Sequence, residues 1–335
     1  MNRCFSINVS IRDFWLFAAG LVFLLQTQIS RADWVERTWN GMGTRIHVEI
    51  WQEDDALAER LIDAVNQEMV RIEALMSTYM EASEVSRVNR EAAGTPVKIT
   101  EELFDLLRKA ERVSQLSDGA FDITYASVGR YYDYRKKLAP DEAQINLAID
   151  AIDYRHVVLN DTDKTVFFTQ PHVYIDLGGI AKGYAVDHAI TLLKEGGVTS
   201  GLVSAGGDTR IIGSKLGRPW IVGVKDPRAE DRNAVMLPLE NTAISTSGDY
   251  ERFFIQDGVR YHHIISPKTG KSAGEVQSVT IIGPDATTTD ALSTTIFVMG
   301  VEKGLALINR LNGIDCIIVD QQRKLHYSKD LQPPG

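Results

Sequence analysis

The stretch "GLVSAGGDTRIIG", from Gly201 to Gly213, decides the fold class of this 335-residue chain. Its two short apolar runs stand on either side of a Gly-Gly pair, which is the spacing of a β-hairpin. Short runs of this kind follow one another through most of the chain after Tyr154. Hairpin spacing favours antiparallel strands, because parallel strands need a long crossover connection.

The remaining segments complete an α+β pattern. Further strands are expected at HVVLN, TVFFT, HVYIDLG, PWIVGVK, AVMLPLE, AISTSG, YERFFI, RYHHIIS, SVTIIG and CIIVD, and an earlier one within RTWNGMGTRIHVEIW. Amphipathic helices are expected at ALAERLIDAVNQEMVRIEALMSTY and at TEELFDLLRKAERVSQLSDG, the second beginning at the N-cap Thr100 and stopping at Gly119. Another helix should follow Gly183, and two more, ATTTDALSTTIFVMG and EKGLALINRL, should precede the last strand. The sequence therefore predicts one α+β domain over residues 33–330, with a mixed, largely antiparallel sheet and flanking helices.

Composition limits the function classes. The chain is 44% hydrophobic and 24% charged, and its net charge is −9. This is ordinary globular composition, and the acidic balance argues against a nucleic-acid partner, which would require a basic surface.

The first 32 residues have the pattern of an export signal. A weakly basic start is followed by the apolar run FWLFAAGLVFLL and then by small residues at Ser30 and Ala32. We expect residues 1–32 to be a signal peptide cut after Ala32, which places the protein in the periplasm. An uncleaved membrane anchor is the alternative interpretation.

The segment "YIDLGGIAKGYAVD", Tyr174 to Asp187, indicates a phosphate-handling turn. Asp176 is expected to end a strand, Gly178 and Gly179 allow close backbone approach, and Lys182 can reach an anion near a helix N-terminus. The spacing fits neither a Walker loop nor a dinucleotide fingerprint. A plain strand-to-helix turn with a solvated lysine remains an alternative.

Two other segments carry side chains suited to metal and proton chemistry. In TTTDALSTT, Asp290 and Thr294 are four residues apart, so on a helix they share a face. Mg²⁺ is often held by few protein oxygens, and a plain helix N-terminus is the competing interpretation. In RYHHIIS, His262 and His263 would point to opposite faces of a strand, so at most one of them faces a given site.

Together and in order, these segments resemble the ApbE family of flavin transferases. The resemblance runs from about Gly41 to Leu311 and rests on GMGT, MSTYMEASEVSRVN, GAFDITYASVG, YIDLGGIAKGYAVD, VSAGGDTRIIG, STSGDYERFF, YHHIISPKTG and ATTTDALSTT. It implies Mg²⁺-dependent transfer of FMN from FAD to a threonine of an acceptor flavoprotein, with AMP leaving.

The resemblance also implies residue roles. Metal ligands would be Gly179, through its carbonyl, with Asp290 and Thr294, and His263 would be the general base. Residues matching FAD contacts are Met42, Tyr79, Ala120, Phe121, Asp122, Asp176, Lys182 and Ile265. The family usually has Asp or Asn where this chain has Ser266, which leaves the hydrogen bonding of that loop open.

Two other functions remain compatible with these residues. An FAD diphosphatase would use the same metal site with water as acceptor and release free FMN. A non-catalytic flavin carrier should contain an acceptor motif of the type D-x-x-[ST]-[GS]-A-[ST], and the chain has none. The resemblance further implies an acceptor close to the inner membrane.

Overall fold

The computed structural model of the protein describes residues 33–332, so the predicted signal segment lies outside it. Its centre is one eight-stranded sheet, with the strand order β1-β2-β6-β7-β10-β13-β14-β15. The strands are β1 (Asp33–Gly41), β2 (Thr44–Gln52), β6 (Gly201–Ala205), β7 (Asp208–Ile212), β10 (Ala243–Gly248), β13 (Val276–Gly283), β14 (Asp315–Asp320) and β15 (Leu325–Tyr327). Every neighbouring pair in this sheet is antiparallel, which confirms the predicted α+β class.

The β6–β7 hairpin forms where the opening stretch predicts it. Ala205 pairs with Asp208, so Gly206 and Gly207 make a two-residue turn. Gly206 has φ +64°, which a residue with a Cβ adopts poorly. The Gly-Gly pair therefore delivers Asp208 to the first position of β7.

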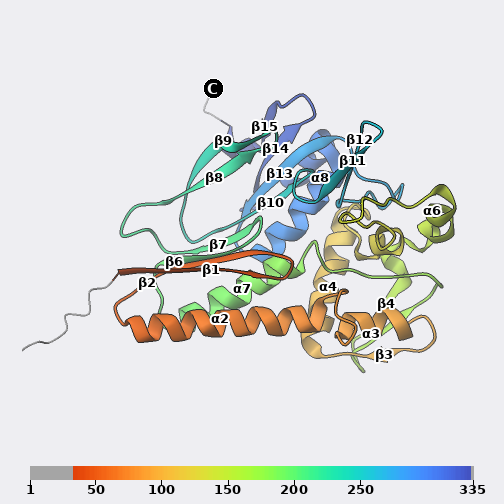
Figure 1. The fold of residues 1–335 in the computed structure, drawn as a ribbon, viewed down its shortest axis with the longest axis horizontal. Helices are drawn as coiled ribbons and strands as arrows, with labels where there is room; N and C mark the ends of the chain where they lie inside the picture. The colour runs from red at the N-terminus through yellow and green to blue at the C-terminus, as the bar shows by residue number, and fades with distance from the viewer. Residues whose placement is uncertain (1–32, 333–335) are drawn as a thin grey trace, which may run out of the picture.

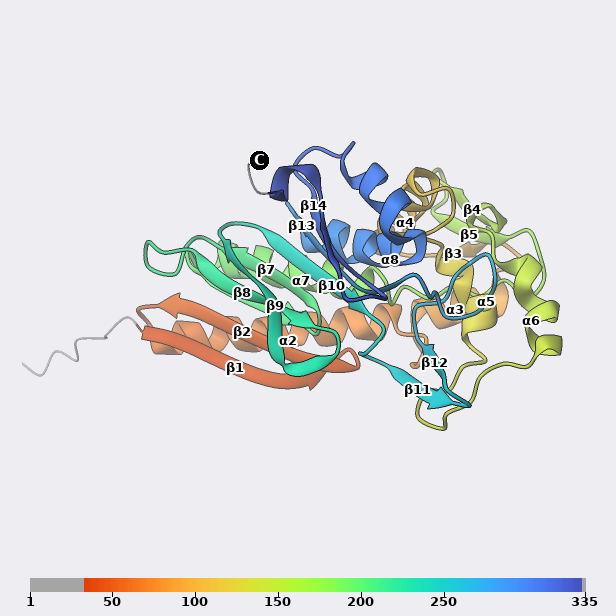
Figure 2. The same ribbon diagram turned by 90° about the horizontal axis from the view of Figure 1, so that it is seen from above.

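Three long helices cover one face of the sheet (Figures 1 and 2): α2 (Asp55–Met76), α7 (Ala181–Glu195) and α8 (Ala286–Ile308). In α2 the buried side chains recur at helical spacing: Ala58, Leu61, Ile62, Val65, Met69, Ile72 and Met76. Each large apolar side chain buried in this way stabilises the fold by about 1.5–3 kcal/mol. The predicted amphipathic helix is thereby confirmed.

The helix α8 is long and apolar enough to cross a membrane, but here it is a core helix packed on β10 and β13. Its backbone leaves helical geometry at Gly300, with φ 76° and ψ −175°. This break divides α8 at the boundary between the two helices expected from the sequence.

A hairpin covers the opposite face of the sheet (Figure 2). It consists of β8 (Trp220–Asp226) and β9 (Ala229–Leu239), and Val224 packs with Ile244 and Ile317 of the central strands.

Most of the remaining helices and strands lie on the right-hand side of the molecule in Figure 1. They include α3 (Glu84–Glu91), α4 (Glu101–Leu116), α5 (Ala126–Gly129), α6 (Glu142–Ala148), a sheet of β3 (Val97–Lys98), β5 (Thr165–Phe168) and β4 (Val157–Asn160), and the hairpin of β11 (Phe253–Gln256) and β12 (Val259–His262). As predicted, Thr100 is the N-cap of α4 and its hydroxyl accepts from the Leu103 amide.

The predicted strand HVYIDLG is wrong: residues 173–177 belong to no strand. Side chains there take the place of the backbone hydrogen bonds that a neighbouring strand would make. The amide group of Asn89 accepts from Ile175 N at 2.8 Å and donates to Ile175 O at 2.9 Å, and Ser127 Oγ accepts from Tyr174 N. Because these partners satisfy the backbone of a buried segment, it needs no neighbouring strand.

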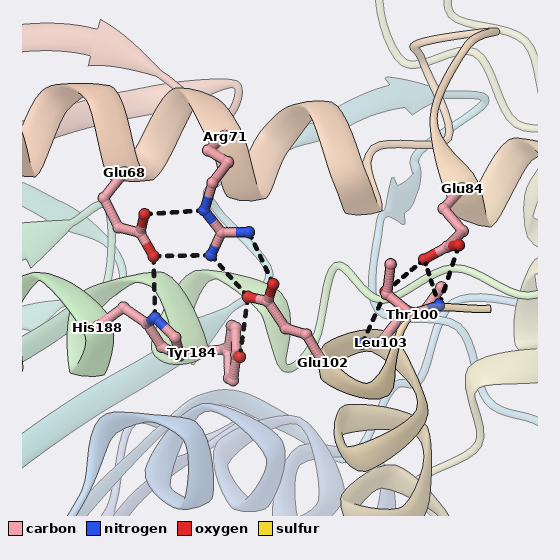
Figure 3. Close-up of polar contacts among 8 residues, drawn as sticks. All are labelled: Glu68, Arg71, Glu84, Thr100, Glu102, Leu103, Tyr184 and His188. Atoms are coloured by element: carbon pink, nitrogen blue, oxygen red, sulfur yellow. Dashed lines mark hydrogen bonds and ion pairs between the residues drawn. The ribbon is translucent and has the colours of Figure 1, made fainter. Parts of the chain in front are cut away.

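A polar cluster joins three helices around the guanidinium of Arg71 (Figure 3). On α2, Arg71 donates two hydrogen bonds to Glu68 and two to Glu102 of α4, all at 2.7–2.9 Å. On α7, Tyr184 bonds to Glu102 and His188 bonds to Glu68. The hydrogen bonds from Arg71 are the largest cause that lowers the pKa of both carboxyls.

Candidate functional site

The site lies where the first turns of α7 and α8 meet. A Cβ on Gly183 would lie 2.1 Å from the carbonyl oxygen of Ala286 and 2.8 Å from the Cβ of Asp290. Since no side chain fits in that space, glycine at this position lets α7 touch α8 backbone to backbone.

Each helix caps the other across this contact. The N-cap of α7 is Ile180, whose side chain cannot accept a hydrogen bond, and Asp290 Oδ2 accepts from Gly183 N instead at 2.9 Å. In return, Asp187 of α7 accepts from the amides of Ala286 and Thr287, both at 2.9 Å. Free N–H groups at helix N-termini are thus satisfied by carboxylates of the opposite helix.

Lys182 lies between two buried carboxylates. Its Nζ is hydrogen-bonded to Asp208 and is 3.7 Å from Asp290 Oδ1, while Asp208 and Asp290 are only 1% and 3% exposed. Burial alone would lower the pKa of Lys182, but the charges of Asp208 and Asp290 raise it overall. Burial and then the charge of Asp208 raise the pKa of Asp290 to about 7, against the opposing effect of Lys182.

Gly179 and Thr294 adjoin this cluster, together with Phe121. A Cβ on Gly179 would lie 3.3 Å from Thr294 Oγ1 and 3.4 Å from the ring of Phe121. Thr294 is one turn beyond Asp290 on α8, and its hydroxyl is 3.3 Å from Ser247 Oγ on β10. The structure therefore brings together the three predicted metal ligands, Lys182 and Phe121.

Asp176 forms the next wall of the site. Its Oδ1 accepts from Gly178 N at 2.7 Å and from the Tyr125 hydroxyl at 3.0 Å, and its Oδ2 accepts from Thr78 Oγ1 at 2.7 Å. Thr78, which is bonded to Asp176, is followed in the sequence by Tyr79, and Tyr79 is 89% exposed. The exposed ring of Tyr79 is a surface on which a planar ligand could stack.

The run Ala120, Phe121 and Asp122 is built around a cap. Asp122 is buried and is the N-cap of the short 3₁₀ helix η1 (Ile123–Tyr125). Its Oδ1 accepts from Thr124 N and its Oδ2 from Tyr154 N. Burial raises the pKa of this carboxyl. Both oxygens already serve the fold, so a ligand contact at Asp122 would fall to its backbone.

The turn between β1 and β2 reaches the other predicted residues through Arg252. Met42 has φ 51°, and its amide donates to Glu73 Oε2 at 3.0 Å. Arg252 donates to the carbonyl of Gly43 at 2.9 Å, and its own carbonyl accepts from His263 N at 3.1 Å. Arg252 thereby links the Met42 turn to His263, a link that the sequence analysis missed.

The two histidines have different surroundings, and only His262 lies on the strand. His262 ends β12 and belongs to the core, where its Nε2 is 2.6 Å from the carbonyl of Ala273 and its ring lies edge-on to Phe297. His263 follows the strand, and its buried Nδ1 has no hydrogen-bond partner in the described part of the chain. Burial, with Arg252 and then His262 and Lys182 nearby, lowers the pKa of His263 to about 3.

The loop after His263 is held by its own backbone. Ile265 is buried and pairs with Ser272, while Ser266 N donates to Lys271 O at 2.8 Å and Ser266 O accepts from Gly270 N at 2.9 Å. This turn needs no charged side chain at position 266, so Ser266 is compatible with it.

Comparison with known proteins agrees with this arrangement. The sequence model of the ApbE family matches residues 42–318. The chain belongs to the ApbE family. Relatives named FAD:protein FMN transferase include those of Klebsiella pneumoniae, 32% identical over 85% of this chain and 88% of the relative, and of Vibrio cholerae, 30% identical over 95% and 98%.

Solved ApbE structures have the same fold. The ApbE protein of Thermotoga maritima has a TM-score of 0.82 and 36% identity, and the flavin transferase ApbE of Vibrio cholerae has 0.80 and 28%. Each comparison covers 89% of this chain and 98% of the other. The predicted membership of the ApbE family and the single α+β fold are confirmed, as is the expectation that the chain is an enzyme.

The donor set at the ApbE site suits a hard divalent cation. Asp290 Oδ1 and Thr294 Oγ1 are oxygen donors on one face of α8, and Gly179, without a side chain, lies against Thr294. Oxygen ligands in small number are what Mg²⁺ uses when phosphates and water complete its shell.

Two other groups of acidic and histidine side chains lie close together among the described residues, and most of their members are paired with other side chains. The group of Glu68, Glu102 and His188 surrounds Arg71, which occupies both carboxylates (Figure 3). In the second group, Glu49 pairs with Lys215 and His47 bonds to Thr38.

Sequence reasoning missed Asp208. It stands at a hairpin turn, where an Asp is ordinarily explained by turn preference. Its role became visible only in the structure, where it is hydrogen-bonded to Lys182, 26 residues earlier.

Proposed function

We propose that this chain transfers FMN from FAD to a threonine hydroxyl of an acceptor flavoprotein, with Mg²⁺ bound and AMP as the leaving group. The observation that carries the proposal is the meeting of Asp290, Thr294 and Gly179 beside Lys182 at the helix contact. Oxygen ligands for a divalent cation, with an ammonium group beside them, together suit a diphosphate. The names of the relatives support flavin transfer as the reaction.

In the proposed reaction the hydroxyl oxygen of the acceptor attacks the phosphorus on the FMN side. A new oxygen–phosphorus bond forms as the bond to the bridging oxygen breaks, and AMP leaves with that oxygen. Mg²⁺ bound to Asp290 and Thr294 would neutralise charge on the phosphate oxygens. Tyr79, which is 89% exposed, offers aromatic surface for the flavin or adenine ring, whereas the ring of Phe121 is buried behind Gly179.

His263 is the proposed acceptor of the hydroxyl proton. Its Nδ1 is buried and unpartnered, and such an atom is costly unless a ligand supplies the missing hydrogen bond. A pKa of about 3 keeps the imidazole neutral at pH 7, with one ring nitrogen free of a proton. Bound phosphates would have to raise this pKa for His263 to act as an effective base. General-base assistance of this kind contributes about 10²–10⁴-fold to a rate.

The test mixes the purified full chain with FAD, Mg²⁺ and a folded acceptor domain. Flavin fluorescence that stays on the acceptor in a denaturing gel supports the transferase. Free FMN and AMP without labelled acceptor would replace it with the diphosphatase. If FAD stays bound and unchanged, with neither labelled acceptor nor free FMN, the chain is a flavin-binding protein.

We also propose that residues 1–32 export the chain to the periplasm, where the acceptor would lie at the inner membrane. The basic, apolar and small-residue order of this segment supports the proposal. A fusion of residues 1–32 to a reporter that is active only after export tests it directly.

A further inference from the structure

We propose that Asp208 is a positioning residue that holds the ammonium of Lys182 away from Asp290, so that Asp290 stays available to a divalent cation. The inference rests on the proposed function, because it concerns the cation expected at Asp290. Asp208 is not among the residues proposed above to bind the metal or the phosphates, so this role is an additional one.

The ammonium group of Lys182 lies closer to the carboxylate of Asp208 than to that of Asp290. Lys182 Nζ is within hydrogen-bond distance of Asp208 but 3.7 Å from Asp290 Oδ1. Asp290 Oδ2 is meanwhile occupied by Gly183 N. The oxygen of Asp290 that faces the cluster is therefore not directly bonded to the lysine.

Asp208 is placed for this task by β7. Residues 208 and 210 are two apart on a strand and so share a face, and both reach α7: Asp208 bonds to Lys182 and Arg210 bonds to Asp187. Asp208 is 1% exposed, so its charge requires a permanent partner. Lys182 is the cation that the structure gives it.

Without Asp208, the ammonium of Lys182 would have one carboxylate within reach. It would move onto Asp290 and compete with the divalent cation for the same oxygen, since a buried charge seeks the nearest opposite charge. The pairing thus keeps two positive groups, lysine and metal, on separate carboxylates within one small site.

The test is a double-mutant cycle of Asp208 and Lys182. The affinity for Mn²⁺ is measured by electron paramagnetic resonance on the purified full chain without FAD. Asp208→Asn keeps the size of the side chain and should weaken Mn²⁺ binding by about tenfold, within the usual range of coupling between neighbouring groups. In a Lys182→Gln background the same change should alter binding by less than about threefold.

Asp249→Asn is the matched control. Asp249 is also buried, at 2% exposed, but its partner is Arg228, at 2.6 and 2.7 Å. This variant should bind Mn²⁺ as the wild type does. Thermal unfolding of every variant shows whether it is folded, and Asp208→Glu, which restores the charge, should recover binding if Asp208→Asn does not fold.

Equal losses in both backgrounds would overturn the inference, because Asp208 would then act on the cation directly. A wild type that binds no Mn²⁺ would overturn it as well. The proposed function has its own test. If the variants bind Mn²⁺ as expected but the chain labels no acceptor, the role of Asp208 is supported and the transferase function is refuted.

Discussion

His263 should make the fold sensitive to mild acid. Its pKa is about 3 in the folded chain, against about 6.5 for an ordinary histidine, and burial is the main cause. The unfolded chain therefore takes up a proton below pH 6.5 that the folded chain refuses. Stability attributable to His263 is complete above pH 6.5 and declines as pH falls toward 3.

The magnitude follows from the two pKa values. At pH 8 both states are neutral, whereas at pH 5 the proton on the unfolded chain favours unfolding by about 2 kcal/mol. Urea unfolding at pH 8, 7, 6 and 5 should show that His263→Gln loses about 2 kcal/mol less stability over this range than the wild type. Only the difference in pH dependence counts, because other groups titrate equally in both chains.

Parallel stability curves for the two chains would refute the reasoning, and so would an NMR titration that places the pKa of His263 near 6.5. The same shift bears on catalysis. Since kcat/KM reports the free enzyme, His263 cannot cause an acid limb above pH 5 in that profile.

Four further outcomes are expected. Asp290→Ala should abolish transfer and also cost about 1 kcal/mol in urea unfolding, because Gly183 N loses its acceptor, whereas Asp290→Asn should abolish transfer at nearly unchanged stability. Gly183→Ala should destabilise the chain by about 1–3 kcal/mol, since its methyl group would overlap the Ala286 carbonyl; an unchanged Tm would contradict the close helix contact. Arg71→Gln should lower stability by about 1–3 kcal/mol while transfer activity persists, because two bonds from α2 to Glu102 of α4 and two bonds to Glu68 within α2 are lost, and none of them involves Asp290. Ser266→Asn should change the transfer rate by less than about threefold, and a larger gain would show that the loop does depend on this side chain.

Elements that depend on local pattern could be predicted from the sequence. Helix α2 follows its apolar period, α4 begins at Thr100 as expected, and the Gly-Gly turn gives the β6–β7 hairpin. The extended segment around Ile175 was predicted as a strand because it is apolar. Its hydrogen-bond partner is the side chain of Asn89, 86 residues earlier, and no local pattern contains that information.

Some features of the candidate site could be expected from the sequence, and others were found only in the structure. The family resemblance proposed Gly179, Asp290 and Thr294 as one group, and the structure brings them together. It did not indicate that Lys182 is bonded to Asp208, nor that Arg252 links His263 to the Met42 turn. Those contacts depend on how distant segments pack, which residue types alone do not determine.

The mutual capping of α7 and α8 has a consequence for the order in which the protein acquires its site. The caps join residues 107 and about 100 positions apart, so neither exists until a long loop has closed. At synthesis rates of about 5–20 residues per second, α7 emerges roughly 5–20 s before α8. Until α8 is made, the chain lacks Asp290 and Thr294, two of the proposed cation ligands. The proposed cation and FAD would therefore bind only to a chain that is nearly complete.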